Sequence, residues 1–490
     1  MTESVDSISN AVDGFFMLIN AQIIFFMQGG FAMLEVGVIQ TKNAKSILFK
    51  NMLDMFVVAL CWFFWGFAIS GDGASGQTER DGVDSGNFGF GQGLTGEGTE
   101  RWGSIDWRNA APFIHSLTYA TTTTTIMSGG VAERMKVEVY IFLSAILSSL
   151  VYSSMVSWCW SEEGFMAKQG FVDFAGSCVV HLVGGSAALV GSILVGPRRN
   201  RFAKDGSVIN FKSTSLVLSS LGAFILAFTW ISFNGSSVLV TKDSSVELSA
   251  FAVLNTFLCL ATAGVSSVLI ETVAHKGTYD LPYTINGMLG GLVAVTASCA
   301  FIDNWCAILL GICSAAVSKG SSWLLLNKLL IDDPLDAFTV HGANGILGTM
   351  WVGLFARKDL LKRFGKDGEG LFMGGGDGSL LEAQVLGCLL AFFFTVGCYV
   401  VACVLWFAMS EGFKQVKGNS VIVVETAGED YDEVDEIDED MTTVSSIDLE
   451  ALSFRDRVCL SLRVSRDAEI VGADFIYHEG NGEWVGVGGG

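Results

Sequence analysis

Long runs of apolar residues alternate with shorter polar stretches along most of the chain. About 20 apolar residues in a helix cross the hydrocarbon core of a bilayer, which is roughly 30 Å thick. Runs such as Met17–Phe31, Leu216–Ser232 and Val385–Met409 reach this length or come close to it. We therefore predict an all-α membrane protein with eleven transmembrane helices. The predicted spans are residues 13–38, 49–70, 110–131, 138–160, 173–196, 214–237, 250–271, 283–301, 303–326, 336–356 and 381–409.

The composition supports this prediction and excludes other classes. Of 490 residues, 51% are hydrophobic and only 16% are charged, whereas a soluble protein carries about 25% charged residues. The eleven cysteines lie mostly in apolar segments and form no C-x-x-C pair, so we interpret them as small buried side chains. We expect no metal or other cofactor. Because no nucleophile–base pair or phosphate-binding loop is visible, we expect no enzyme.

Charge divides the chain into two parts. Much of the net charge of −21 comes from the loop at 72–100 and from residues 425–440. Such acidic stretches are solvated and carry little information about the fold. We predict a transmembrane domain at residues 1–410 and a cytosolic acidic tail at 411–490. No basic patch indicates a nucleic-acid partner.

The distribution of lysine and arginine predicts the orientation. The loop at 197–213 holds five basic residues, and Lys42 and Lys45 follow the first span. Cytoplasmic loops are enriched in Lys and Arg, so both loops belong in the cytoplasm. The N-terminus is then outside and the C-terminus is cytosolic. The loop at 357–380 does not follow this rule, because its five basic residues lie on the predicted outer side.

Two of the five histidines lie deep in apolar segments and have matching surroundings. His181 follows Asp173 by eight residues, and His341 follows Asp333 by the same distance. A glycine lies four residues after each histidine, so both segments share the pattern D-x7-H-x3-G. The predicted topology makes the two spans antiparallel, so each histidine approaches the midplane, about 12 Å from its aspartate. This is the geometry of a 5+5 inverted repeat with its site at the repeat interface. The alternative is two unrelated histidines in helix packing, although ionisable groups at this depth usually line a pathway.

Several segments resemble signatures of the ammonium transporter (Amt/Mep/Rh) family. They are GFAMLEVGVIQTKN (30–43), SGGVAER (128–134), DFAGSCVVHLVGG (173–185), WISFNGSS (230–237) and DDPLDAFTVHGANGILG (332–348). The resemblance covers roughly residues 13–410 and reappears near 462–480. It implies an eleven-span homotrimer with one pore per subunit and with ammonium or ammonia as substrate. We expect it in the plasma membrane.

The resemblance also implies roles for residues at the outer mouth. Trp160 and Ser237 match an outer recruitment site to which Tyr119 also contributes. Tyr119 and Phe233 match two stacked aromatic rings that close the pore, and Asp173 matches an aspartate near the recruitment site. The predicted topology agrees independently, since it brings Trp160, Tyr119, Phe233 and Ser237 to the outer face.

His181 and His341 match the family's twin histidines, which suggests a mechanism. An aromatic face attracts a cation by about 0.5–2 kcal/mol, and a hydroxyl can accept an N–H. An unpaired ion in the core costs far more than this attraction supplies. Our hypothesis is that ammonium loses a proton at the mouth, neutral ammonia passes the histidines, and they relay the proton separately. Asp173 either stabilises the cation at a distance or braces the backbone.

Two other functions remain open. One is an ammonium sensor that transports slowly, and the other is an electroneutral Rh-type gas channel. Trp160 and the complete outer site favour a charged substrate. His115, one turn before Tyr119, stands where the family more often has an aromatic residue. It is either a spectator or a group that makes uptake sensitive to pH.

The tail departs most from the family. Ile476 occupies the place of a threonine that is phosphorylated in plant-type members. Phosphorylation could instead occur on hydroxyl residues of the acidic stretch, which is otherwise a solvated spacer. These candidate regulatory residues are Thr442, Thr443, Ser445 and Ser446.

Overall fold

The computed structural model describes residues 2–71, 107–238, 245–274, 277, 279–417, 457–458, 461–464 and 469. In the first half of the chain the helices are α1 (Thr2–Phe25), α2 (Met27–Val38), α3 (Ala44–Cys61), α4 (Phe67–Ser70), α5 (Trp107–Val131), α6 (Val137–Ile146), α7 (Ser153–Trp160), α8 (Phe165–Lys168) and α9 (Val183–Val195). In the second half they are α10 (Leu216–Gly235), α11 (Ser245–Ala274), α12 (Leu281–Thr296), α13 (Asn304–Trp323), α14 (Asn344–Phe355), α15 (Lys358–Arg363) and α16 (Ser379–Lys417).

Short turns of other helix types join or interrupt these helices. One is a 3-10 turn, η1 (Thr41–Asn43), and the others are the π-helical turns η2 (Trp62–Gly66), η4 (Leu147–Tyr152), η5 (Ser177–Leu182), η6 (Leu324–Lys328) and η7 (Phe338–Ala343). The described residues contain no β-strand and only two isolated β-bridges. The expected all-α class is therefore confirmed for this part of the chain.

Eight helical segments of the described chain are long and apolar enough to cross a bilayer. They are Ile8–Val38, Thr41–Ser70, Val137–Lys168, Ser177–Val195, Leu216–Gly235, Val246–Ala274, Asn304–Lys328 and Ser379–Ser410. The other three expected spans coincide with α5, α12, and η7 followed by α14. These segments are more polar or shorter, because α5 carries five consecutive threonines and α12 has only 16 residues. The count of eleven spans thus stays a prediction.

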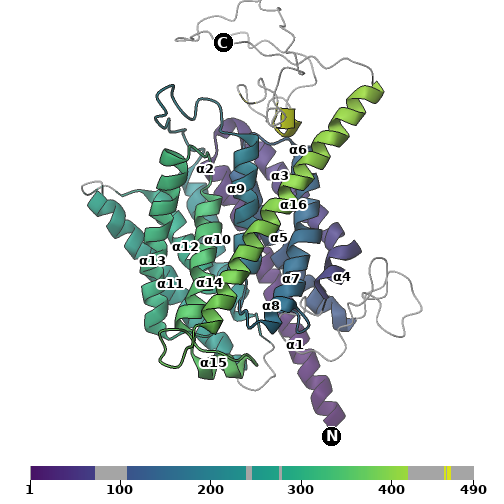
Figure 1. Cartoon of the computed structure of the whole chain (residues 1–490), viewed down its shortest axis with the longest axis vertical. Coiled ribbons are helices and arrows are strands. Elements are labelled where there is room, and N and C mark those ends of the chain that lie inside the picture. Colours follow the sequence, from purple (N-terminus) through teal and green to yellow (C-terminus); the bar gives the residue numbers. More distant parts are fainter. Residues whose placement is uncertain are drawn as a thin grey trace, which may run out of the picture.

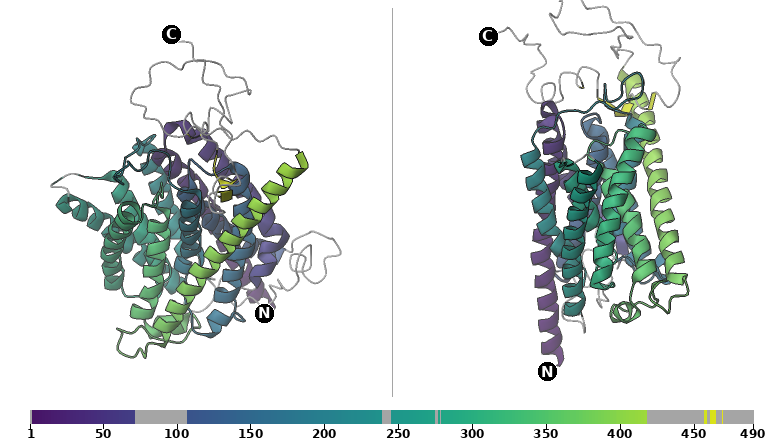
Figure 2. Two further views of the ribbon diagram at one scale, coloured as in Figure 1. Left: turned by 45° about the horizontal axis from the view of Figure 1, so that its top comes forward. Right: turned by 90° about the vertical axis from the view of Figure 1, so that its left-hand side faces the viewer.

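The helices form an upright bundle, with α16 running obliquely across one side (Figure 1). Helix α1 begins at one end of the bundle, and α16 ends at the other, as the views of Figure 2 also show.

Local signals explain where some helices begin. The Ser215 hydroxyl accepts a hydrogen bond from the Leu218 amide ahead of α10, and the Asp280 carboxylate accepts one from the Tyr283 amide in α12. Such side chains satisfy the amide groups that a helix leaves free at its start.

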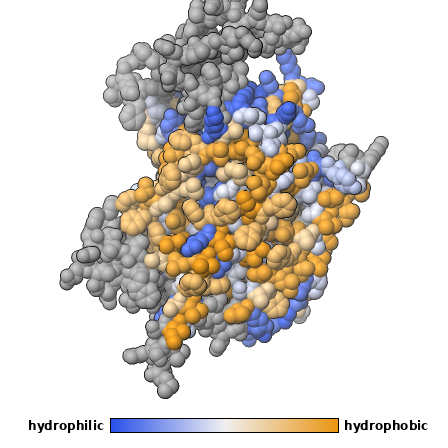
Figure 3. All heavy atoms as spheres, turned by 180° about the vertical axis from the view of Figure 1, so that it is seen from behind, coloured by the Kyte–Doolittle hydropathy of each residue, from blue (hydrophilic) through white to orange (hydrophobic). Residues whose placement is uncertain are grey.

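The outer surface of the bundle is apolar. A broad hydrophobic band covers the middle of the face in Figure 3, with hydrophilic residues gathered toward its ends. Large side chains such as Val217 (79% exposed), Phe224 (71%) and Phe393 (65%) point outward. Exposed apolar area of this extent is unfavourable in water but matches a lipid environment.

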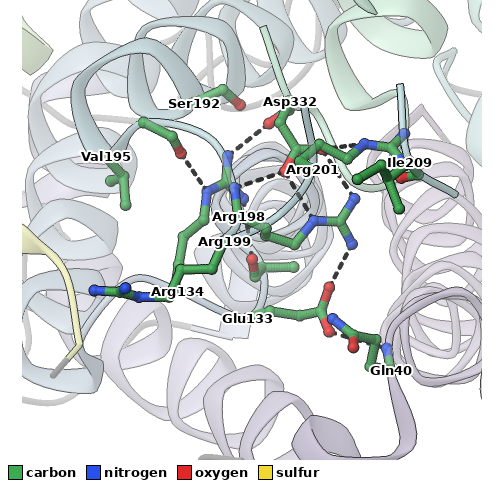
Figure 4. Close-up of polar contacts among 12 residues, drawn as sticks. Gln40, Glu133, Arg134, Ser192, Val195, Arg198, Arg199, Arg201, Ile209 and Asp332 are labelled. Atoms are coloured by element: carbon green, nitrogen blue, oxygen red, sulfur yellow. Dashed lines mark hydrogen bonds and ion pairs between the residues drawn. The ribbon is translucent and has the colours of Figure 1, made fainter. Parts of the chain in front are cut away.

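A cluster of buried charges holds one end of the bundle together (Figure 4). We call it the basic-loop end, because it carries the loops at 39–43 and 197–213. The Arg198 guanidinium donates to both carboxylate oxygens of Asp332, at 2.8 and 2.9 Å, and also to Glu133. The Arg201 side chain lies 3.2 Å from Asp332, and Arg134 donates to the Asp332 carbonyl at 2.6 Å.

The electrostatics of this cluster favour the charged forms. Burial alone would raise the pKa of the Asp332 carboxyl, but the hydrogen bonds and charge of Arg198 outweigh burial and hold that pKa well below its usual range. Burial likewise opposes the charge on Arg198, yet Asp332 and Glu133 keep its pKa above the ordinary value. The cluster is therefore a paired ionic contact between the connection after α9 and the segment before η7.

A short piece of the tail adds to the same end. The Val464 amide donates to the Arg134 carbonyl at 2.8 Å, and the Lys136 amide donates to the Leu462 carbonyl at 3.0 Å. The Glu469 carboxylate accepts hydrogen bonds from the Arg463 guanidinium, the shortest at 2.5 Å. The described part of the tail thus contacts the basic-loop end directly.

Candidate functional site

The two predicted histidines meet inside the bundle. Nδ1 of His181 lies 3.2 Å from Nδ1 of His341, and the ring centroids are 5.2 Å apart with an interplanar angle of 23°. Both side chains are buried, His181 completely. One ring must donate the shared hydrogen and the other must accept it. The pair therefore holds one proton between two neutral imidazoles.

Each histidine lies on a π-helical turn, His181 on η5 and His341 on η7. Such turns are rare and occur frequently at functional sites. Asp173 fixes the start of η5, because its carboxylate accepts hydrogen bonds from four successive amides at 2.8–3.0 Å, those of residues 176–179. In the second half of the repeat, the Asp333 carboxylate accepts a hydrogen bond from the Phe338 amide at 2.8 Å. Of the two roles proposed for Asp173, these contacts support bracing of the backbone.

The glycines of the repeated pattern let the two turns approach each other. A methyl group at Gly185 would lie 2.4 Å from the Gly342 nitrogen, and one at Gly345 would lie 2.6 Å from the Ser177 carbonyl oxygen. Both distances are shorter than any ordinary van der Waals contact. Each glycine therefore packs against the turn that carries the other half's histidine, which explains why the pattern extends four residues beyond each histidine.

Tyr119 and Phe233 stack beside the histidine pair. Their ring centroids are 4.2 Å apart at 30°, and both side chains are buried. The Tyr119 hydroxyl donates to the Phe233 carbonyl at 2.7 Å and lies 3.1 Å from the Ser237 hydroxyl. Phe233 also contacts His181, with ring centroids 5.7 Å apart. The structure thus brings the two predicted gate residues together directly above the histidines.

The remaining residues of the predicted recruitment site lie beside the same pair of rings. The Trp160 ring meets the Tyr119 ring edge to face at 6.4 Å, and its indole nitrogen donates to the Asp173 carbonyl at 2.8 Å. His115 lies 5.1 Å from Tyr119 between ring centroids, and its Nε2 pairs with the Ser236 hydroxyl at 3.0 Å. Because its ring is buried and hydrogen-bonded, His115 is a structural neighbour of the gate in this conformation.

Two aromatic contacts of the histidines escaped the sequence interpretation. Trp230 stacks on His181 at 4.9 Å and 16°, and Phe31 lies 5.9 Å from His341. Both residues belong to segments that resemble family signatures, but the hydrophobic pattern alone gives no reason to single them out. The candidate regulatory residues Thr442, Thr443, Ser445 and Ser446 lie outside the described residues.

Apolar helices that expose large side chains around a buried polar pair are stable only within lipid. The chain is an integral, multi-pass membrane protein. A profile described as the Ammonium Transporter Family matches residues 15–416. The chain belongs to the ammonium transporter family, whose members are transporters and not enzymes.

Relatives and solved structures agree with this assignment. The chain is 36% identical over 401 residues to "Ammonium transporter 3" of Dictyostelium discoideum, covering 80% of this chain and 88% of the relative. A solved structure described as "Sensor Amt Protein" superposes with a TM-score of 0.74 at 26% identity, over 96% of this chain and 100% of the other. The crystal structure of Candida albicans Mep2 shares the fold, with a TM-score of 0.69 at 24% identity over 82% of this chain and 84% of that protein.

Proposed function

We propose that the protein takes up ammonium in the plasma membrane as a homotrimer of eleven-span subunits, with the N-terminus outside and the C-terminus cytosolic. Trp160, Tyr119 and Ser237 recruit the cation at the outer mouth. Cation attraction to the aromatic faces and N–H donation to hydroxyl oxygens distinguish ammonium from potassium, which has no proton to donate.

The Tyr119 and Phe233 rings then separate, and ammonium loses its proton before it enters the narrow part of the pore. Neutral ammonia passes His181 and His341, while the proton crosses through the shared hydrogen of the imidazoles. The observation that supports this mechanism is the 3.2 Å contact between the two Nδ1 atoms directly beneath the stacked gate rings. Uptake then carries one net charge and is driven by about 2.3 kcal/mol per 100 mV.

The contact between the two histidines predicts that both are needed for ammonium current. We expect His181→Ala and His341→Ala each to reduce ammonium-evoked current by roughly tenfold or more, since each change removes one partner of the proton relay. The measurement is voltage-clamped current in oocytes, normalised to surface protein and repeated with potassium. If both variants keep wild-type current and still exclude potassium, the relay role is wrong.

An ammonium sensor is the second candidate, because one structural relative over nearly the whole chain is described as a sensor. Growth and ammonium flux in a strain that lacks its own transporters separate the two functions. Rapid flux supports transport, and binding with negligible flux supports sensing. An electroneutral gas channel would give flux without current.

A further inference from the structure

A small cavity lies next to His341 on the side of the basic-loop end. It is lined by Phe31, Glu35, Thr125, Asn286 and His341 among others. Its free volume of about 20 Å³ holds roughly one molecule the size of water or ammonia. The mechanism proposed above assigns no residue to this region, although the proton must leave the histidines toward this side.

Glu35 presents a carboxylate to this cavity. Its Oε2 accepts hydrogen bonds from the Ser128 hydroxyl at 2.8 Å and from the Asn51 amide at 3.1 Å. Oε1 accepts none from the residues that the structure describes. His341 also lines this cavity. Its Nδ1 faces Nδ1 of His181, and its Nε2 has no hydrogen-bond partner within the described chain. A carboxylate and an imidazole thus line one space that holds roughly one water molecule.

The position of Glu35 is unusual for a structural residue. Its side chain is 1% exposed, and no cation of the described chain lies within ion-pair distance of it. Carboxylates at such depth are costly, rare and usually part of a pathway. Asp54, on the neighbouring helix, is also buried and accepts hydrogen bonds from Thr124 and Thr125 at 3.0 Å. The cavity therefore adjoins a polar layer between α2, α3 and α5.

This polar layer continues toward the surface. Lys50 precedes Asn51 on α3 and donates a hydrogen bond to the Met135 carbonyl. It lines a second small cavity at the basic-loop end, together with Glu133 and the tail residue Val464. Polar side chains thus extend from the histidine cavity to a cavity beneath the docked tail.

We infer that Glu35 accepts the proton that leaves His341 and releases it at the basic-loop end. In each cycle one proton passes from the imidazole to the bridging water, and one passes from that water to the carboxylate. The neutral acid then gives this proton to water at the exit, so the carboxylate is regenerated. Ammonia follows its own path and takes no part in this step. The inference depends on the relay in the proposed function.

The competing explanation is that Glu35 serves only to join α2, α3 and α5 through Asn51 and Ser128. The two explanations predict different effects on charge movement and on the passage of ammonia. Loss of a proton acceptor blocks charge movement and leaves the passage of neutral ammonia intact. Loss of a structural contact lowers both together, because it disturbs the pore itself.

The test uses full-length protein in liposomes with two readouts. Ammonium-evoked current is measured by solid-supported membrane electrophysiology. Ammonia entry is measured as alkalinisation of the liposome lumen, reported by a trapped pH-sensitive dye. We expect Glu35→Gln to lower the current by roughly tenfold or more, the range of a lost acid–base group, and to increase the alkalinisation, because ammonia that enters without its proton takes one up from the lumen. Glu35→Asp should retain most of the current. Glu271→Gln is the matched control, because Glu271 on α11 is buried and paired with Lys319 on α13, and it does not line the cavity.

Each outcome decides a separate point. If wild-type protein shows neither current nor flux, the proposed function fails. If it carries current and Glu35→Gln is unchanged, only the present inference is overturned. A fall in current with no rise in alkalinisation also overturns it. Should Glu35→Gln fail to assemble, Ser128→Ala replaces it, since this variant keeps the carboxylate but removes one of its donors. Its current should fall while alkalinisation rises, and an unchanged current would refute the inference.

Discussion

Tyr119 adds a hydroxyl to the proposed gate, which otherwise depends on ring stacking. That hydroxyl ties α5 to the Phe233 carbonyl on α10 at 2.7 Å. The resemblance to family motifs predicts the roles of both residues, and the predicted topology brings them to one end of the pore. Sequence could not supply the ring partners Trp230 and Phe31, because the rotation of each helix about its axis decides which aromatic faces a histidine.

Opening the gate must break the Tyr119 tether. A hydrogen bond of this kind contributes about 0.5–1.5 kcal/mol, so Tyr119→Phe should raise the maximal current by roughly 2- to 10-fold. The measurement is saturating current per surface protein in oocytes. Tyr152→Phe is the control, since the buried Tyr152 hydroxyl has no hydrogen-bond partner among the described residues. An unchanged or smaller current in Tyr119→Phe would contradict the tether.

The helical elements of the site are two helices that begin on π turns and cross at glycines. The D-x7-H-x3-G pattern predicted that the two segments belong together, because it repeats the aspartate, the histidine and the close-packing glycine at equal spacing. Their antiparallel direction was predicted from the order of the spans. The π turns were not predictable. Periodicity in sequence distinguishes a helix from a strand, but a single extra residue in a turn leaves no hydrophobic signature.

The crossing predicts a strong effect of a single methyl group. Gly185→Ala would place a carbon 2.4 Å from the Gly342 nitrogen, so the two helices must separate. We expect a loss of about 1–3 kcal/mol in stability, as overpacking usually costs, and loss of most ammonium current. Thermal unfolding in detergent and current measure the two effects. Gly397→Ala on α16 is the control, because no atom lies within 4 Å of the added carbon.

At the scale of the whole molecule, the basic-loop end connects the two halves of the chain. From the sequence, Arg198 is one of several cytoplasmic charges that predict the orientation. The structure instead buries Arg198 between Glu133 and Asp332, which lie 65 and 134 positions away. Contacts over such separations depend on how the spans pack. The tally of lysines and arginines in a loop cannot reveal which of them are paired.

Asp332→Asn removes the carboxylate on which Arg198 and Arg201 converge. Breaking a buried pair typically costs about 3–5 kcal/mol, so the melting temperature should fall clearly at pH 7. Because the folded pKa of Asp332 is depressed, its contribution is complete above the unfolded pKa of about 3.9. It is lost as the pH falls further toward the folded pKa.

The difference in melting temperature between wild type and Asp332→Asn should therefore be constant from neutral pH to about pH 5 and shrink below about pH 4. Thermal unfolding in detergent across this range measures it. The control is Asp205→Asn, since Asp205 belongs to the loop that carries Arg198 but is exposed. A difference that grows on acidification would contradict the assigned sign.

The distance along the chain between Arg198 and Asp332 also has a consequence for biosynthesis. A ribosome adds about 5–20 residues per second, so the 134 residues between them take roughly 7–27 s to synthesise. During that interval the first half of the protein is already in the translocon with its guanidinium still in water. Burial of this arginine is thus a late event of assembly, and a nascent chain that stops before Asp332 cannot complete it.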